Sequence, residues 1–98
     1  MSFADPLKMF PKRWSKKRRE IIKRDGHRCM FVENGKRCRH KRMLQVHHII
    51  PKSENPALLW DDNNLITLCV KHHKMISGRE HEYMGKFRKL LDEAEGSK

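Results

Sequence analysis

Imidazole and thiol side chains gather in a few short stretches of this 98-residue chain. Two adjacent histidines stand at His47-His48, and a Cys-x-x-His-His run follows at residues 69–73. Thiolate and imidazole are ligands that zinc prefers in proteins, and imidazole is also well suited to take a proton near neutral pH. The spacing therefore predicts metal binding, with His47, His48 and His73 available for hydrolytic chemistry beside a metal.

Four of these side chains form a two-plus-two set for one metal. Cys69 and His72 stand at i and i+3 on the first turn of an expected helix, and Cys29 and Cys38 come from an earlier segment. Four nitrogen and sulfur ligands leave no open position on zinc, and such closed sites are structural. Because so small a core is hardly stable on its own, we expect structural zinc to clamp the two segments together.

A β-hairpin is expected to carry the first pair of ligands. Asn34-Gly35 is a strong hairpin signal, because a type I′ turn needs a positive φ at both central residues. Counting outward from this turn places Phe31 opposite Cys38 and Cys29 opposite His40. Cys29, Cys38 and His40 are then neighbours, so His40 is a rival to Cys38 as a zinc ligand.

Two short strands and a helix are expected to position the histidines. The strands cover residues 44–50 and 65–68, and the helix covers residues 69–77. Adjacent residues in a strand point to opposite faces. His47 and His48 can therefore approach one site only if they lie at a strand end or at a bend.

Further helices are expected on both sides of this unit. Residues 16–24 crowd lysine and arginine on adjacent turns, and residues 79–95 repeat apolar side chains every three or four positions. The repeated apolar residues are Tyr83, Met84, Phe87, Leu90, Leu91 and Ala94. We assign residues 1–13 to an N-terminal arm, residues 14–95 to a single domain and residues 96–98 to a C-terminal tail.

The overall charge indicates the kind of partner. A net charge of +11, from 23 Lys+Arg against 12 Asp+Glu, favours a polyanion, with nucleic acid first and an anionic membrane surface second. Three cysteines cannot all pair with one another, and neither a signal segment nor a membrane-spanning apolar run is evident. We therefore expect a cytoplasmic protein whose thiols bind metal.

The order of these motifs resembles the HNH nucleases of the ββα-metal type. His47-His48 closes a β-rich run, Asn64-Leu65 opens a second, and Cys69 with His72-His73 enters a helix. The resemblance implies an α+β fold with a ββα-metal core, a structural zinc site and flanking N- and C-terminal helices. Cys29 and Cys38 are farther apart in the sequence than the two cysteines of the Cys-x-x-Cys knuckle that is common in the family.

The same resemblance implies a role for each histidine. It makes His47 and His73 ligands of a catalytic divalent ion, and His48 the general base that activates water. Asn64 matches the middle residue of the signature and would tie the loop that orients the base. Its neighbours Asn63, Asp61 and Asp62 remain alternatives for that role. Mg²⁺ or Mn²⁺ is the expected ion, although two imidazoles also suit other transition metals.

The implied function is a metal-dependent DNA endonuclease that leaves 5′-phosphate and 3′-hydroxyl ends, by nicking or by double-strand cleavage, with weak sequence specificity. The small size also resembles HNH proteins encoded by bacteriophages beside their packaging genes. That resemblance implies terminase proteins as partners and the bacterial host cytoplasm as the location. Two other hypotheses stand beside it: a non-catalytic zinc module that binds nucleic acid, and a zinc-stabilised scaffold that docks proteins through the helix of Tyr83, Phe87 and Leu91.

Overall fold

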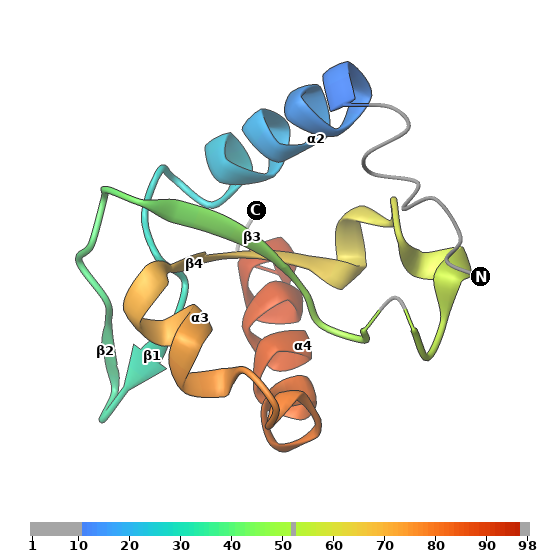
Figure 1. The fold of residues 1–98 in the computed structure, drawn as a ribbon. Helices are drawn as coiled ribbons and strands as arrows, with labels where there is room; N and C mark the ends of the chain where they lie inside the picture. Colours follow the sequence, from blue (N-terminus) through green and yellow to red (C-terminus); the bar gives the residue numbers. More distant parts are fainter. Residues whose placement is uncertain (1–10, 52, 97–98) are drawn as a thin grey trace.

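The structure, a computed structural model, describes residues 11–51 and 53–96 (Figure 1). Most of the arm expected over residues 1–13, and most of the tail expected over residues 96–98, lie outside the described residues. The fold is α+β, as expected. Its elements are α2 (Pro11–Arg24), β1 (Val32–Glu33), β2 (Lys36–Arg37), β3 (Leu44–His48), the 3-10 helices η1 (Pro56–Leu58) and η2 (Asp62–Asn64), β4 (Leu65–Cys69), α3 (Val70–Ile76) and α4 (Glu80–Gly96).

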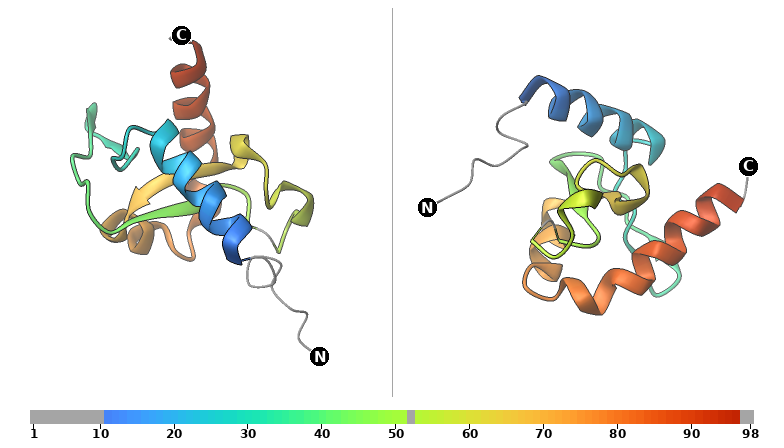
Figure 2. Two further views of the ribbon diagram at one scale, coloured as in Figure 1. Left: turned by 90° about the horizontal axis from the view of Figure 1, so that it is seen from above. Right: turned by 90° about the vertical axis from the view of Figure 1, so that its right-hand side faces the viewer.

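The antiparallel hairpin of β3 and β4 lies at the centre of the molecule. Its register runs from the pair Leu44 and Cys69 to the pair His48 and Leu65. All five residues of β4 are buried, because helices cover both faces of this hairpin. Helix α2 lies on one side, and α3 and α4 lie on the other (Figure 2). No helix in the described ranges is both long enough and apolar enough to cross a bilayer.

Helix α2 is longer than the sequence suggests. It begins at Pro11, five residues before the expected start, so residues 11–13 belong to a helix and not to an arm. Proline suits a first helical turn because the backbone N–H that it lacks would have no intrahelical partner there. The expected end at Arg24 is confirmed, and Gly26 follows with a φ of 77°.

The hairpin of β1 and β2 follows the predicted register. Asn34 and Gly35 have φ values of 53° and 76°, as a type I′ turn requires. The backbone pairing continues beyond the strands, since Cys38 N donates to Phe31 O at 2.8 Å and Cys29 N donates to His40 O at 3.0 Å. The two cysteines are therefore held on neighbouring segments by ordinary hairpin hydrogen bonds.

Strand β3 ends at His48, two residues before the expected end at Ile50. Beyond this point the side chain of Asn64 provides the hydrogen bonds of the backbone, accepting from Ile50 N at 2.8 Å and donating to Ile50 O at 3.1 Å. At the other end of the pair, β4 runs on to Cys69, which is also the N-cap of α3. His48 consequently stands where the regular strand stops.

Helix α4 packs its apolar face against the core. Phe87 and Leu91 are buried in the main cluster, and Tyr83, Met84 and Leu90 are partly buried against it. The side chain of Ala94 lies outside the described part of the chain. The burial confirms an amphipathic helix whose apolar side is used within the molecule.

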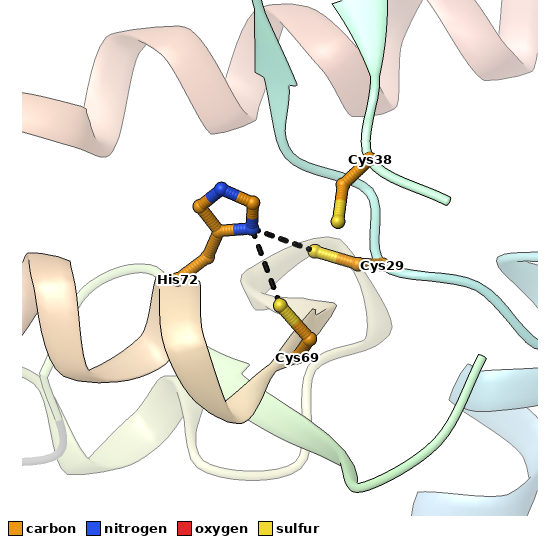
Figure 3. A group of neighbouring side chains, drawn as sticks. All are labelled: Cys29, Cys38, Cys69 and His72. Carbon is orange, nitrogen blue, oxygen red and sulfur yellow. Dashed lines mark hydrogen bonds between the residues drawn. The ribbon is translucent and has the colours of Figure 1, made fainter. Parts of the chain in front are cut away.

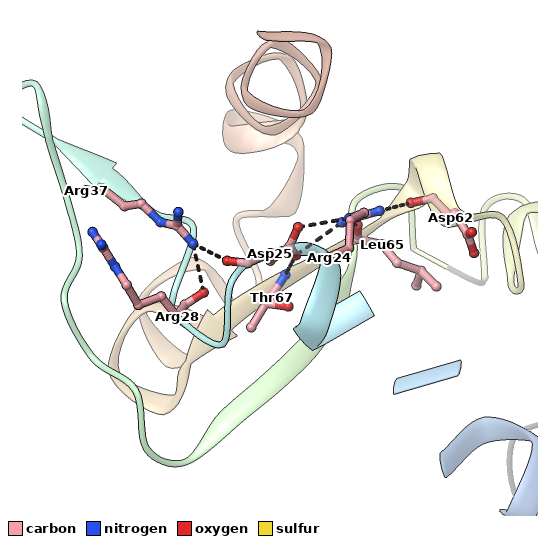
Figure 4. Close-up of polar contacts among 7 residues, drawn as sticks. All are labelled: Arg24, Asp25, Arg28, Arg37, Asp62, Leu65 and Thr67. Atoms are coloured by element: carbon pink, nitrogen blue, oxygen red, sulfur yellow. Dashed lines mark hydrogen bonds and ion pairs between the residues drawn. The ribbon is translucent and has the colours of Figure 1, made fainter. Parts of the chain in front are cut away.

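A buried carboxylate joins α2 to the strands (Figure 4). Asp25 is 4% exposed, and its side chain accepts from Thr67 N at 2.9 Å and from Arg24 Nε at 2.9 Å. Arg24 also donates to Leu65 O at 2.6 Å. On the other side, the guanidinium of Arg37 donates to the carbonyl of Asp25 and to Cys29 O. These contacts fix α2, the first hairpin and β4 relative to one another.

Replacing Asp25 with alanine should lower the free energy of unfolding by about 2–3 kcal/mol, because it leaves Thr67 N–H and part of Arg24 without partners. Urea denaturation of the zinc-loaded protein measures this loss. Asp62→Ala is the matched control. Its carboxylate is 60% exposed and pairs only with Lys17 among the described residues, so less than about 1 kcal/mol should be lost. Equal losses in the two variants would contradict the structural role of Asp25.

Candidate metal centre and active site

Cys29, Cys38, Cys69 and His72 point toward one another at the start of α3 (Figure 3). Their ligand atoms all lie within 4.8 Å of one another, and three of the four residues are buried. Cys29 Sγ and Cys69 Sγ lie 3.5 and 3.2 Å from His72 Nδ1. All three cysteines are free thiols. The first hairpin and the β4–α3 junction thus contribute one pair of ligands each.

The donor set fits zinc. Ligand atoms on one tetrahedral zinc ion lie roughly 3.5–3.8 Å apart, because each bond is about 2.0–2.3 Å long. Burial raises the pKa of the Cys29 thiol to about 12, although backbone hydrogen bonds from Cys69 and Phe31 act in the opposite direction. Burial, together with the charge of Lys71, lowers the pKa of His72 and keeps its imidazole neutral. Zinc would displace the thiol protons and hold the ligands as a closed structural site.

His40 lies next to this cluster without being part of it. Its Nδ1 is 3.9 Å from Cys38 Sγ, and its side chain is exposed. Cys38, by contrast, has its sulfur within reach of the other ligand atoms. The ring of His72 is further supported by Phe31, which stacks on it at 4.3 Å between centroids. The geometry therefore favours Cys38 over its rival His40.

His47 and His73 face each other on the α3 side of the central hairpin. Their ring centroids are 5.5 Å apart and their planes are inclined by 72°. His47 is 7% exposed and packs against Phe87, whereas His73 is half-buried on α3. Since metal–imidazole bonds are roughly 2 Å long, this separation allows both rings to reach one ion.

One nitrogen of His47 is an exception among the buried polar atoms. His47 Nε2 is buried and has no hydrogen-bond partner among the described residues. Such an atom ordinarily costs about 1–3 kcal/mol. Burial, and then the proximity of His73, lowers the pKa of His47 to about 4, although Glu80 acts in the opposite direction. His47 is therefore neutral at pH 7, the state in which imidazole binds metals.

The low pKa of His47 predicts a pH dependence of stability. The unfolded chain binds a proton at His47 below its ordinary pKa of 6.5, whereas the folded chain binds one only below about 4. The free energy of unfolding should fall by about 3 kcal/mol as the pH drops through this range. Urea denaturation of the parent and of His47→Asn at several pH values measures this dependence. Loss of zinc at low pH affects both proteins, so the difference between their profiles reports on His47. If the difference between their profiles is flat, His47 is not buried in a neutral form.

His48, the last residue of β3, contacts α2 through Trp14. Its Nε2 lies 3.1 Å from Leu59 O, so the ring donates a proton to this carbonyl. Its face stacks on the indole of Trp14, with centroids 5.6 Å apart and planes inclined by 14°. His48 is half-buried. The ring is consequently fixed between α2 and the η1 segment, at the end of the strand that carries His47.

Among the four polar residues that end the loop before β4, Asn64 is the one that ties the backbone. It is 1% exposed and bonds Ile50 and, at 3.4 Å, the carbonyl of Leu58. Asp61 instead caps η2 by accepting from Asn63 N, and Asp62 pairs with Lys17. The side chain of Asn64 thus links the end of β3 to Leu58. The carbonyl of the next residue, Leu59, accepts the hydrogen bond from His48.

The cations near His73 in the sequence differ in whether another side chain already pairs with them. Lys71 and Lys74 are exposed on α3. Arg79 donates to Glu82 at 2.8 Å, and this carboxylate raises the pKa of the guanidinium. Arg79 is therefore already neutralised in part, whereas the two lysines are better placed for contacts with DNA.

The sequence did not reveal two neighbours of His48. Trp14 belongs to no motif of the sequence, and the carbonyl of Leu59 lies in a loop without a motif. Trp14 is 34 positions before His48, so no local pattern could pair them. The one weak signal is an aromatic residue close to the start of the basic helix expected over residues 16–24.

A two-stranded antiparallel hairpin and a following helix define a small protein of ββα architecture. It carries paired histidines and a cluster of three cysteines and one histidine that is consistent with a structural zinc site. The scan against protein-family models matches HNH endonuclease over residues 28–79, just over half of the chain, and the chain belongs to this family. Membership implies metal-dependent hydrolysis of phosphodiester bonds with DNA as the substrate. Neither the search of curated proteins nor that of solved structures gives a significant match.

Proposed function

We propose that the protein is a DNA endonuclease in which His47 and His73 hold one divalent ion and His48 acts as the general base. The observation that carries this proposal is the buried Nε2 of His47, which lacks a partner among the described residues while its ring faces that of His73 at 5.5 Å. A bound cation would satisfy this nitrogen. The ion would supply stabilisation of the negative charge that develops on the scissile phosphate and the leaving 3′ oxygen.

The contacts of His48 support its role as the base. Donation from Nε2 to Leu59 O fixes the tautomer, so Nδ1 is the nitrogen that takes a proton from the attacking water. Trp14 restrains the ring from its face. Asn64 is proposed as a positioning residue, since it holds the segment around Leu58 and therefore the carbonyl that orients His48.

The choice of ion and of target also belongs to this proposal. Two imidazoles leave several positions for water and phosphate oxygens, which suits Mg²⁺ or Mn²⁺ during cleavage and does not exclude other transition metals. Weak sequence specificity is proposed because lysine and arginine contacts to phosphates carry no sequence information. A phage origin and action beside terminase proteins in a bacterial cytoplasm rest on the resemblance in size and motif alone.

The test is incubation of supercoiled plasmid with the zinc-loaded protein and Mg²⁺ or Mn²⁺. We expect open-circular or linear DNA with 5′-phosphate ends, and no product when EDTA is added with the plasmid. Binding without cleavage under every divalent ion would overturn the enzymatic proposal and favour a non-catalytic zinc module. A scaffold that docks proteins through α4 is disfavoured, because Phe87 and Leu91 are buried in the core.

A further inference from the structure

The cations of α2 fall into two sets that differ in their partners. Those on the inner side hold the helix to the rest of the molecule. Lys17 Nζ contacts Asp62 at 2.5 Å, and Arg18 Nη2 donates to Leu44 O at 2.7 Å. Arg13 lies over the ring of Trp60 at 4.9 Å. These charges, like that of Arg24, serve the docking of α2 onto the strands.

The second set consists of Lys12, Lys16, Arg19 and Lys23, which we call the outer stripe. At 100° per residue these four positions fall within about 60° of one another, on the opposite side of the helix from the buried Ile21. All four side chains are exposed. None makes a hydrogen bond or an ion pair with any residue in the described part of the chain.

The outer stripe is costly for an isolated helix. Lys12 and Lys16, like Arg19 and Lys23, are like charges four residues apart, which destabilises a helix. The first turn of α2 contains no acidic residue, so the cation at Lys12 also opposes the helix dipole. Glu20 is the single acidic residue of the helix. A polyanion along this face would offset these repulsions.

We infer that the outer stripe binds the phosphate backbone of the nucleic acid that the protein cuts, an inference that takes the identity of the polyanion from the proposed function. A row of four cations over about 16 Å of helix spans about five nucleotides of one strand. An anionic membrane fits less well, because the apolar side of α2 is used in the core: Ile21 and Ile22 are 2% and 9% exposed and cannot enter lipid.

The outer stripe also has a defined position relative to the candidate active site. Trp14, between Lys12 and Lys16 in sequence, stacks on His48 from the inner side of the same helix. The N-terminal end of the outer stripe is therefore separated from the proposed base by the diameter of the helix and by the Trp14–His48 stack, roughly 15 Å in all. Phosphates bound there belong to nucleotides outside the scissile step, so the stripe should affect affinity and not the chemical step.

The experiment measures binding of the zinc-loaded full chain to a labelled 20-base-pair duplex at several salt concentrations without Mg²⁺ or Mn²⁺. For K12Q/K16Q/R19Q/K23Q we expect the slope of log affinity against log salt to decrease in magnitude by about 3 to 4. The affinity at 0.1 M salt should be at least roughly tenfold weaker. The charge-retaining variant K12R/K16R/R19K/K23R should behave like the parent. Lys16→Gln should reduce the slope by about 0.9, and Lys89→Gln, which removes an exposed lysine of α4, should leave it unchanged.

An unchanged slope in the quadruple glutamine variant would overturn the inference, as would equal effects of Lys16→Gln and Lys89→Gln. Loss of binding to phosphatidylserine vesicles with unchanged binding to the duplex would overturn it in favour of a membrane. The outcome is separate from the endonuclease proposal. If the parent binds the duplex through the outer stripe but cuts no plasmid, this inference stands and the endonuclease proposal fails. If the parent cuts plasmid but the quadruple glutamine variant has an unaltered salt slope, only the endonuclease proposal stands.

Discussion

Replacing His48 with alanine is expected to lower the rate of plasmid cleavage about 10²–10⁴-fold, the usual contribution of a positioned general base. The reason is geometric: Leu59 O and Trp14 hold this imidazole in one tautomer and one orientation at the end of β3. Affinity for DNA should change by less than about twofold, because an imidazole at this position adds no contact to a phosphate. Single-turnover cleavage with saturating protein separates the rate from binding.

His81→Ala is the matched control for this substitution. His81 is an exposed histidine on α4 whose partner is Glu54, at 2.7 Å, and an exposed ion pair of this kind contributes little to stability. Its cleavage rate should equal that of the parent. Circular dichroism and zinc content verify that both variants fold. A His48→Ala variant that folds and cuts as fast as the parent would remove His48 from the mechanism.

Loss of the structural zinc should unfold the protein. Zinc binding contributes about 10–16 kcal/mol in small zinc domains, which is as large as the whole stability of a typical domain. The cluster joins the first hairpin to the start of α3, so loss of the metal removes the link between these two segments. Cys69→Ser, or prolonged chelation, should abolish the cooperative thermal transition followed by circular dichroism.

His40→Ala provides the matched control for the cluster. His40 is exposed and 3.9 Å from Cys38, so its loss should leave one zinc per chain and an unchanged melting temperature. Cys38→Ser should lose zinc. The reverse result, with zinc retained by Cys38→Ser and lost by His40→Ala, would show that the histidine is the fourth ligand.

The zinc cluster and the first hairpin could be predicted because their determinants are local. Asn34-Gly35 specifies the turn, and the turn determines which residues lie opposite each other. Cys69 and His72 share a helical turn for the same kind of reason. The match of these motifs to the family model then agrees with the fold that was expected from them.

The surroundings of the histidines could not be predicted because they depend on tertiary contacts. Asp25 directly follows the helix expected over residues 16–24, and nothing in the local sequence indicates that it accepts from Thr67 N, 42 positions later. The alternation of strand residues indicated that His47 and His48 diverge, but not that α2 would lie against the second of them. That contact depends on how α2 packs, and helix packing is set by the whole core rather than by one segment.

The central claim is that His47 and His73 bind a second divalent ion that is distinct from the zinc. Titration of the zinc-loaded protein with Mn²⁺, followed by electron paramagnetic resonance, measures this directly. We expect one additional ion per chain in the parent, and loss of that ion in His73→Ala and His47→Asn while the zinc remains. Mn²⁺ binding that is unchanged in both variants, or absent from the parent even with uncleavable DNA present, would contradict the proposed site.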